Sequence, residues 1–176
     1  MTKPVLGRNN EVVPWEYVVR QRKTQEVDGV DVIAKIRDKF ICVAVYRYPL
    51  SKYVLGFPAG LMENLEPAEA ALKELKEEAG YTARIEDITY ISPQVFIDPW
   101  KSTESTIFVM VNVPEIPENE HPEQNLEGEE EIIVELIDKE DFIDKAIKVC
   151  EEKGYLLEAR LFMFGKGLKD TFNSLR

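Results

Sequence analysis

Residues 58–81 read PAGLMENLEPAEAALKELKEEAGY, and this stretch decides the fold. A glycine-containing turn leads into a segment with apolar residues at helical spacing, namely Ala68, Ala71, Leu72, Leu75 and Ala79. Pro67 suits the first turn of a helix, and Gly80 suits the position after the last turn. The stretch therefore predicts a turn followed by an amphipathic helix whose apolar stripe packs on a core.

The same predicted helix carries three glutamates within five residues. Because successive helical residues advance by about 100°, Glu74 and Glu78 lie on one side, and Glu77 falls in the same wide sector. They flank the apolar stripe, and their mutual repulsion requires neutralisation. Two interpretations stay open: a solvated helix face paired with neighbouring lysines, or a site for a hard divalent cation that also takes the carbonyl of Ala59.

The composition limits the chemistry that the chain can support. Its 176 residues, 44% hydrophobic and 31% charged, predict one ordinary globular domain. The net charge of -11 opposes binding to a nucleic-acid backbone. His121 is the only histidine, so zinc sites and Ser-His-Asp catalysis lack their usual parts. Catalysis would then depend on carboxylates, which favour Mg²⁺ or Mn²⁺.

Cysteine usage and hydropathy indicate a cellular location. Cys42 and Cys150 are far apart in apolar segments, which predicts buried thiols in a reducing compartment. No apolar run approaches the roughly 20 residues of a membrane span, and the polar start MTKPVLGRNN lacks the apolar region of a signal peptide. We expect a cytoplasmic protein, with the nucleus as an alternative location, and no membrane partner.

The order of the remaining segments indicates the fold class. Asp28-Gly29 predicts a turn before an apolar strand, and residues 114–131 predict a long loop of the kind that is often functional. Strand-like segments surround the helix and two helical segments close the chain; the strands fall in residues 30–36, 40–48, 53–60, 83–91, 105–113 and 131–137, and the helices in 138–154 and 155–172. This order predicts an α+β fold with a mixed sheet packed between helices.

Gly60, Glu66 and the run KELKEEAGY (73–81) resemble the Nudix box, G-x5-E-x7-R-E-U-x-E-E-x-G-U, where U is aliphatic or aromatic. Further stretches resemble the eukaryotic ADP-sugar (ADP-ribose) pyrophosphatases of that superfamily, namely PWEYVVRQRKTQEVDGVDVIAKI, VYRYPLSKYVLGFPAGL, PQVFIDP and LLEARLFMFGKGLK. The resemblance implies a Nudix fold, an α/β/α sandwich, with an N-terminal strand extension in residues 1–29 and the hydrolase domain in residues 30–176.

The resemblance also implies a metal site. Its Mg²⁺ ligands fall on Glu74, Glu78 and the carbonyl of Ala59, with Glu77 as a further ligand and Mn²⁺ as an alternative ion. Two or three ions of this kind would bridge a pyrophosphate and activate a water.

The family places its catalytic glutamate in a late loop just before a strand, which is the GEEEII run in this chain. Counted from Gly128 the match is Glu131, and counted back from the run IDKEDF it is Glu130. Both residues therefore stay candidates for orienting or deprotonating the attacking water.

Substrate contacts follow from the resemblance one residue at a time. Trp15 resembles the tryptophan that stacks on adenine, and Arg20 resembles the arginine of the same segment. Arg47 matches an arginine that contacts the diphosphate, and Leu61 would touch the substrate through its backbone. Asp98 matches an acidic residue contributed across a dimer in which the N-terminal strands cross between subunits. The implied assembly is a homodimer that takes a nucleoside diphosphate-sugar.

Four departures from the family pattern bear on activity. Only six residues separate Glu66 from Lys73 instead of seven, and Lys73 replaces the arginine of the box, which holds a carboxylate by a two-pronged fork. Gly56 stands where the family often has glutamate, and Trp100 stands where it prefers glycine.

The resemblance implies a Mg²⁺-dependent pyrophosphohydrolase that cleaves ADP-ribose or related ADP-sugars to AMP and a sugar phosphate. Two alternatives stay open. One is a catalytically weak Nudix-fold module that binds ADP-ribose or a nucleotide. The other is a hydrolase of oxidised nucleoside diphosphates.

Overall fold

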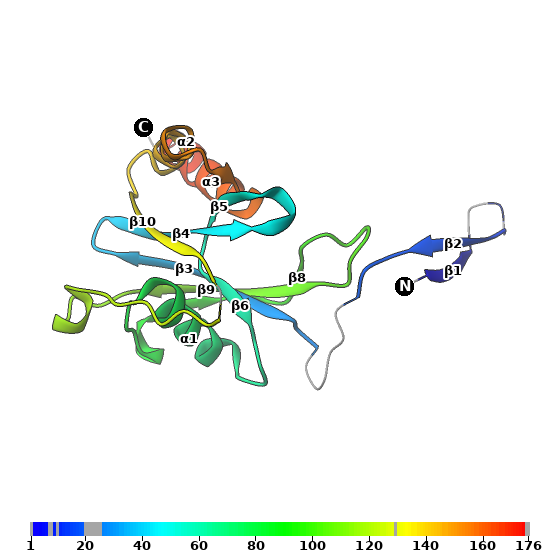
Figure 1. Cartoon of the computed structure of the whole chain (residues 1–176), viewed down its shortest axis with the longest axis horizontal. Helices are drawn as coiled ribbons and strands as arrows, with labels where there is room; N and C mark the ends of the chain where they lie inside the picture. Colours follow the sequence, from blue (N-terminus) through cyan, green and yellow to red (C-terminus); the bar gives the residue numbers. More distant parts are fainter. Residues whose placement is uncertain (1, 7–8, 10, 20–25, 129, 175–176) are drawn as a thin grey trace.

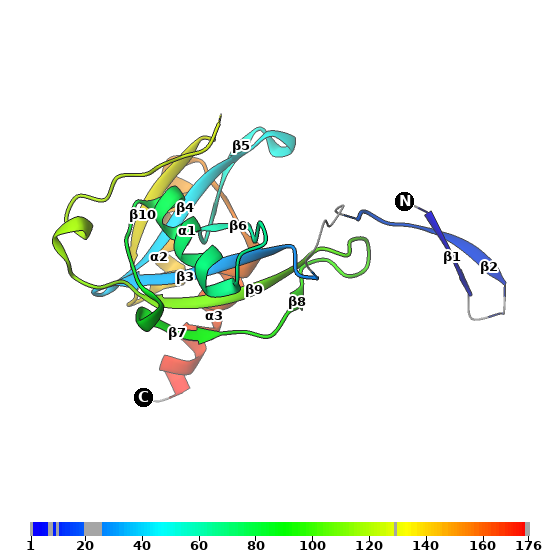
Figure 2. The same ribbon diagram turned by 90° about the horizontal axis from the view of Figure 1, so that it is seen from below.

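The chain forms a large mixed sheet and a separate small hairpin. This computed structural model describes all of the chain except residues 1, 7–8, 10, 20–25, 129 and 175–176. The hairpin pairs β1 (Thr2–Leu6) with β2 (Val12–Glu16) antiparallel, and it lies apart from the body in both overall views (Figures 1 and 2).

The large sheet has nine strands in the described part of the chain. Its main path runs β11-β5-β4-β3-β9-β7, while β10, β6 and β8 pair with β4, β3 and β9. The strands are β3 (Gly29–Ile36), β4 (Lys39–Arg47), β5 (Lys52–Gly56), β6 (Ala59–Leu61), β7 (Ile88–Ile91), β8 (Val95–Phe96), β9 (Ser105–Asn112), β10 (Ile132–Asp138) and β11 (Leu156–Leu157). Strands β3 and β9 are parallel, so the sheet is mixed as predicted.

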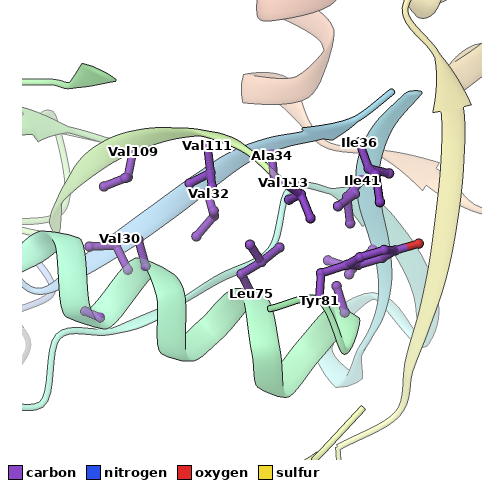
Figure 3. Packing of buried hydrophobic residues seen from close by; sticks show 14 of the residues in the cluster. Val30, Val32, Ala34, Ile36, Ile41, Leu75, Tyr81, Val109, Val111 and Val113 are labelled. Atoms are coloured by element: carbon purple, nitrogen blue, oxygen red, sulfur yellow. The ribbon is translucent and has the colours of Figure 1, made fainter. Parts of the chain in front are cut away.

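Helices cover both faces of this sheet. Figure 1 shows α1 (Pro67–Ala79) on one face and α2 (Phe142–Lys153) with α3 (Ala159–Ser174) on the other. Each face has its own buried apolar cluster. In the first cluster Leu75 points toward the valines of β3 and β9, and Tyr81 lies beneath Ile41 (Figure 3). The arrangement confirms the predicted α+β fold with its sheet between helices.

Helix α1 has the ends that its sequence predicts. Pro67 is the first helical residue, and the Glu69 carboxylate accepts a hydrogen bond from the Glu66 N–H. Gly80 ends the helix in the left-handed region, with φ at 80°. Ala71, Leu75 and Ala79 of the predicted stripe are fully buried.

Strands β3 and β4 separate beyond their hairpin, and this split positions the site. The two strands pair only from Ala34↔Ile41 to Ile36↔Lys39. Farther along, β6 takes the place of β4 beside β3, and the Val32 N–H donates to the Pro58 carbonyl at 2.8 Å. The chain between β5 and β6 therefore lies inside the sheet layer.

The predicted turn at Asp28-Gly29 is wrong, because Gly29 is the first residue of β3. A Cβ at Gly29 would lie 2.5 Å from the carbonyl oxygen of Gly60. The glycine thus permits the close approach of β6. The Asp28 carboxylate accepts hydrogen bonds from the Ser105 N–H and hydroxyl.

The remaining segments agree with the sequence in most respects. The described part of residues 114–131 forms the expected long connection and contains the short 3₁₀ helix Pro117–Asn119. Cys42 and Cys150 are buried free thiols, as predicted. Within the described residues, no helix has the length and apolar character needed to cross a membrane.

Candidate active site

Helix α1 turns two of its glutamates toward the protein interior. Glu74 and Glu78 keep only 9% and 7% of their surface exposed. Burial raises the pKa of Glu74 to about 7, and the nearby Glu77 carboxylate adds to this effect. Burial likewise raises the pKa of Glu78 to about 8, with Glu74 contributing repulsion. The helix therefore holds two carboxylates in an environment that disfavours their charge unless a cation is present.

The bend before the helix meets these two carboxylates directly. The Ala59 N–H donates to Glu78 Oε2 at 2.8 Å. A Cβ at Gly60 would overlap the carboxylate of Glu74, so glycine is required for this approach. The bend and the two buried carboxylates are therefore in direct contact.

The third glutamate of the helix has a basic partner. Lys73 Nζ lies 2.8 Å from Glu77, 3.3 Å from Glu63 and 3.6 Å from Glu127. Lys73 stands at the position of the box arginine, and it neutralises Glu77 by a single-point contact. Of the two interpretations of the acidic helix, pairing with a neighbouring lysine therefore applies to Glu77. Glu74 and Glu78 are buried instead.

A cavity of about 200 Å³ lies between the bend, the helix and the late loop. Six of its ten lining residues are glutamates, and the full lining is Ala59, Gly60, Leu61, Glu63, Lys73, Glu74, Glu77, Glu78, Glu127 and Glu130. With six glutamates and a single lysine in its lining, this cavity is strongly acidic.

The cavity residues fit a hard divalent cation. Among the described residues, no three carboxylate, thiol or imidazole groups converge on one point, because Ala59 holds Glu78 and Lys73 holds Glu77. Rotation of these side chains about their own torsions is required for convergence. Carboxylate and carbonyl oxygens, in a space kept open by Gly60, are the kind of donors that Mg²⁺ and Mn²⁺ take.

The structure separates the two candidates in the late loop. Glu130 lines the acidic cavity, and its charge raises the pKa of both Glu74 and Glu78. Glu131 points elsewhere, since its Oε2 accepts a hydrogen bond from the Tyr53 hydroxyl at 2.8 Å. The structure thus brings Glu130 to the site.

A second cavity, of about 290 Å³, adjoins the first and shares Ala59, Gly60 and Leu61 with it. Arg47, the residue predicted to contact the diphosphate, lines this cavity. The cavity also contains Asp31 and Arg160, which the sequence analysis missed. A carboxylate inside the apolar strand run GVDVIA was the available signal for Asp31.

Comparison with known proteins identifies the family, because residues 25–159 match the NUDIX domain. This chain belongs to the Nudix family. Over 169 residues it is 31% identical to the ADP-ribose pyrophosphatase of Saccharomyces cerevisiae, covering 91% of this chain and 71% of the relative. It is 31% identical over 163 residues to the ADP-sugar pyrophosphatase of Mus musculus, covering 88% and 73%.

A solved structure confirms the Nudix fold. The crystal structure of an ADP compounds hydrolase superposes with a TM-score of 0.66 at 20% identity, covering 97% of this chain and 85% of that one. The Nudix box of this chain therefore sits in the fold expected for it, on the bend and helix α1.

Two predicted substrate residues, Trp15 and Asp98, lie away from the two cavities of this Nudix domain. Trp15 Nε1 donates to the Trp100 carbonyl at 3.1 Å, and Asp98 accepts from Lys101 Nζ at 3.0 Å. Neither Trp15 nor Asp98 lines a cavity that contains box residues. Arg20 falls outside the described residues. The segment that follows β2 instead contacts the loop of residues 97–104, where the Val18 N–H donates to the Lys101 carbonyl at 2.7 Å.

Proposed function

We propose that this Nudix hydrolase is a Mg²⁺-dependent pyrophosphohydrolase that cleaves ADP-ribose or a related ADP-sugar to AMP and a sugar phosphate. The observation that carries the proposal is the pair of adjoining cavities, one lined by six glutamates and the other by Arg47. The names of the yeast and mouse relatives, both pyrophosphatases of ADP compounds, support the substrate class.

The acidic cavity is the proposed metal site. Glu74, Glu78 and the carbonyl of Ala59 would hold Mg²⁺, with Glu77 as a further ligand and Mn²⁺ as a substitute ion. When bound, the ion would neutralise charge on the diphosphate and lower the pKa of a water that it binds. Lys73 offsets part of the repulsion that Glu77 adds at Glu74.

The remaining steps use side chains around the two cavities. Arg47 binds diphosphate oxygens by charge-assisted hydrogen bonds and orients the scissile bond. The backbone of Leu61, at the junction of the cavities, limits where the phosphate lies. Glu130 receives the proton of the attacking water at its carboxylate, since it is the late-loop glutamate that lines the acidic cavity.

We further infer a homodimer in which residues 1–29 form an extension and residues 30–176 form the catalytic domain. In the extension, Val12, Trp15 and Val18 are 70%, 48% and 63% exposed. A two-stranded hairpin with exposed apolar side chains is marginally stable alone, which favours packing against a second copy. Trp15 and Asp98 would then complete the site of the partner.

Turnover of ADP-ribose in Glu78→Gln tests this function. With Mg²⁺ present, we expect the variant to release AMP at least about 100-fold more slowly, because a ligand that supports charge neutralisation is lost. Glu152→Gln makes the same chemical change at an exposed position of α2 and should retain full activity. Equal rates in wild type and Glu78→Gln would refute the metal role. Tight binding without AMP release would favour the catalytically weak module.

A further inference from the structure

The second cavity contains a buried ion pair that the proposed chemistry does not use. Asp31, in the middle of β3, is 3% exposed, and its Oδ1 lies 2.6 Å from Arg160 Nη1. The Thr106 hydroxyl donates to the other carboxylate oxygen at 2.7 Å. Register places Asp31 opposite Ala59 in the β3–β6 pair, one strand away from the metal-site bend.

Arg160 is held from a second side, so its guanidinium is preorganised. Its Nε donates to Glu158 Oε1 at 2.8 Å, and Glu158 Oε2 accepts from the Arg160 N–H at 2.7 Å. The Glu158 N–H in turn donates to the Leu55 carbonyl, which anchors this segment to β5. These contacts use two of the five guanidinium N–H donors, and the other three have no hydrogen-bond partner among the described residues.

The two arginines of the cavity differ in their electrostatic surroundings. Arg160 faces two carboxylates, Asp31 and Glu158, so its positive charge is more than balanced. Arg47 has no ion pair among the described residues, and its charge acts on Glu78 at the acidic cavity. A phosphate is therefore attracted toward Arg47 and the metal site, whereas the Asp31–Arg160 side favours a neutral group rich in hydroxyls.

We propose that Asp31 and Arg160 recognise the hydroxyl groups of the sugar on the second phosphate, and so select nucleoside diphosphate-sugars over nucleotides that end in phosphate. The carboxylate accepts from sugar hydroxyls and the guanidinium donates to them. A cavity of about 290 Å³ is at the small end for ligand pockets and suits one sugar better than a whole dinucleotide. The inference rests on the proposed function, and it assigns the specificity that distinguishes ADP-sugars from oxidised nucleoside diphosphates.

The wild-type protein provides the first test, with ADP-ribose and ADP compared in the presence of Mg²⁺. We expect kcat/KM for ADP-ribose to exceed that for ADP by at least about 100-fold, because a site built to bind hydroxyls rejects a ligand that lacks them. Absence of turnover would contradict the proposed function alone, and calorimetry with the same ligands would then test recognition directly. Equal kcat/KM values, equal affinities or absence of binding would overturn the inference.

Asp31→Asn provides the second test. We expect kcat/KM for ADP-ribose to fall about 10-fold or more, chiefly through KM, while kcat/KM for ADP changes less than about twofold. The matched control is Glu135→Gln, which alters another ion pair of a buried carboxylate, that of Glu135 with the exposed Lys153 at 2.5 Å, outside both cavities. This control should lower stability without changing the ratio of the two substrates.

A double variant that makes both residues of the pair neutral keeps the test valid if the single variant does not fold. Asp31→Asn combined with Arg160→Gln removes both charges, which avoids leaving one of them buried alone. The double variant should show the same loss of preference for ADP-ribose, and circular dichroism verifies its fold. A proportional loss on both substrates in these variants, or failure of both to fold, would show that the pair is structural and overturn the inference.

Discussion

Because Gly60 has no side chain, β6 can approach α1 closely. A Cβ there would overlap the Glu74 carboxylate, so Gly60→Ala must displace that group. We expect AMP release from ADP-ribose to fall at least about 100-fold and the Mg²⁺ concentration for half-maximal rate to rise. Gly167→Ala is the control, because nothing lies within 4 Å of an added Cβ in α3 and helix propensity improves. Unchanged Mg²⁺ dependence in Gly60→Ala would argue against Glu74 as a ligand.

The raised pKa values of two glutamates make the stability of the metal-free protein depend on pH. The pKa values of Glu74 and Glu78, about 7 and about 8, exceed the ordinary glutamate pKa of 4.5. Between pH 4.5 and pH 8 the folded chain therefore binds more protons than the unfolded chain. We therefore expect the Tm in EDTA to fall as the pH rises from about 5 to about 8. Added Mg²⁺ should raise the Tm most at the upper end, where both carboxylates ionise.

Thermal unfolding of Glu78→Gln separates the effect of this carboxyl group on the pH dependence of Tm from the effect of the net charge of the protein. The variant lacks one titrating carboxyl group, so its Tm should decline less steeply over the same pH range. A metal-free Tm that rises with pH in the wild type, or identical slopes in the two proteins, would contradict the assigned direction of the pKa shifts.

Among the elements, the long connection between β9 and β10 contacts the C-terminal end of α1. Gln124 Nε2 donates to the Glu78 carbonyl at 2.6 Å and to the Ile132 carbonyl at 3.2 Å. The Asn125 N–H donates to the Glu77 carbonyl at 2.9 Å. One side chain thus links the end of α1 to the start of β10.

Truncation of this link should loosen the late loop. We expect Gln124→Ala to lower kcat about 10-fold and the free energy of unfolding by about 1 kcal/mol, the usual contribution of such hydrogen bonds. Asn125→Ala is the matched control, because its contact uses the backbone N–H and survives the change. Steady-state kinetics and urea unfolding measure the two effects. Equal kcat values in the two variants would show that the Gln124 link has no part in positioning Glu130.

At the scale of the whole molecule, the N-terminal hairpin is the feature on which the proposed dimer depends. It meets the body through the loop of residues 97–104, where Trp15 and Val18 make backbone-directed hydrogen bonds. Its apolar side chains are otherwise largely exposed, and both overall views show it extending from the domain (Figures 1 and 2).

Deletion of residues 1–18 should convert a dimer into a monomer, as measured by light scattering. We expect KM for ADP-ribose to rise at least about 10-fold, because stacking of a base on an aromatic ring contributes about 1–3 kcal/mol. Trp15→Ala should raise KM while leaving the dimer intact, which separates assembly from substrate contact. A monomeric full-length chain with the same KM as the truncated chain would refute the dimer proposal.

Local sequence pattern is sufficient to predict most of the elements and the acidic helix. Apolar periodicity, Pro67 and Gly80 specify α1, and helical geometry alone places Glu74 beside Glu78, because these relations involve residues within a few positions of one another. The strands and closing helices follow from the same kind of local pattern, and the box motif identifies the family.

Only the tertiary structure decided what meets across the sheet. Local pattern could not choose between Glu130 and Glu131, because the choice depends on Tyr53 of a distant strand. The same holds for Gly29, which serves the approach of β6, and for Asp31 with Arg160, which are paired across 129 positions of the chain (160 minus 31). Contacts between distant residues depend on how whole elements pack, and hydrophobic periodicity does not encode which polar side chains that packing brings together.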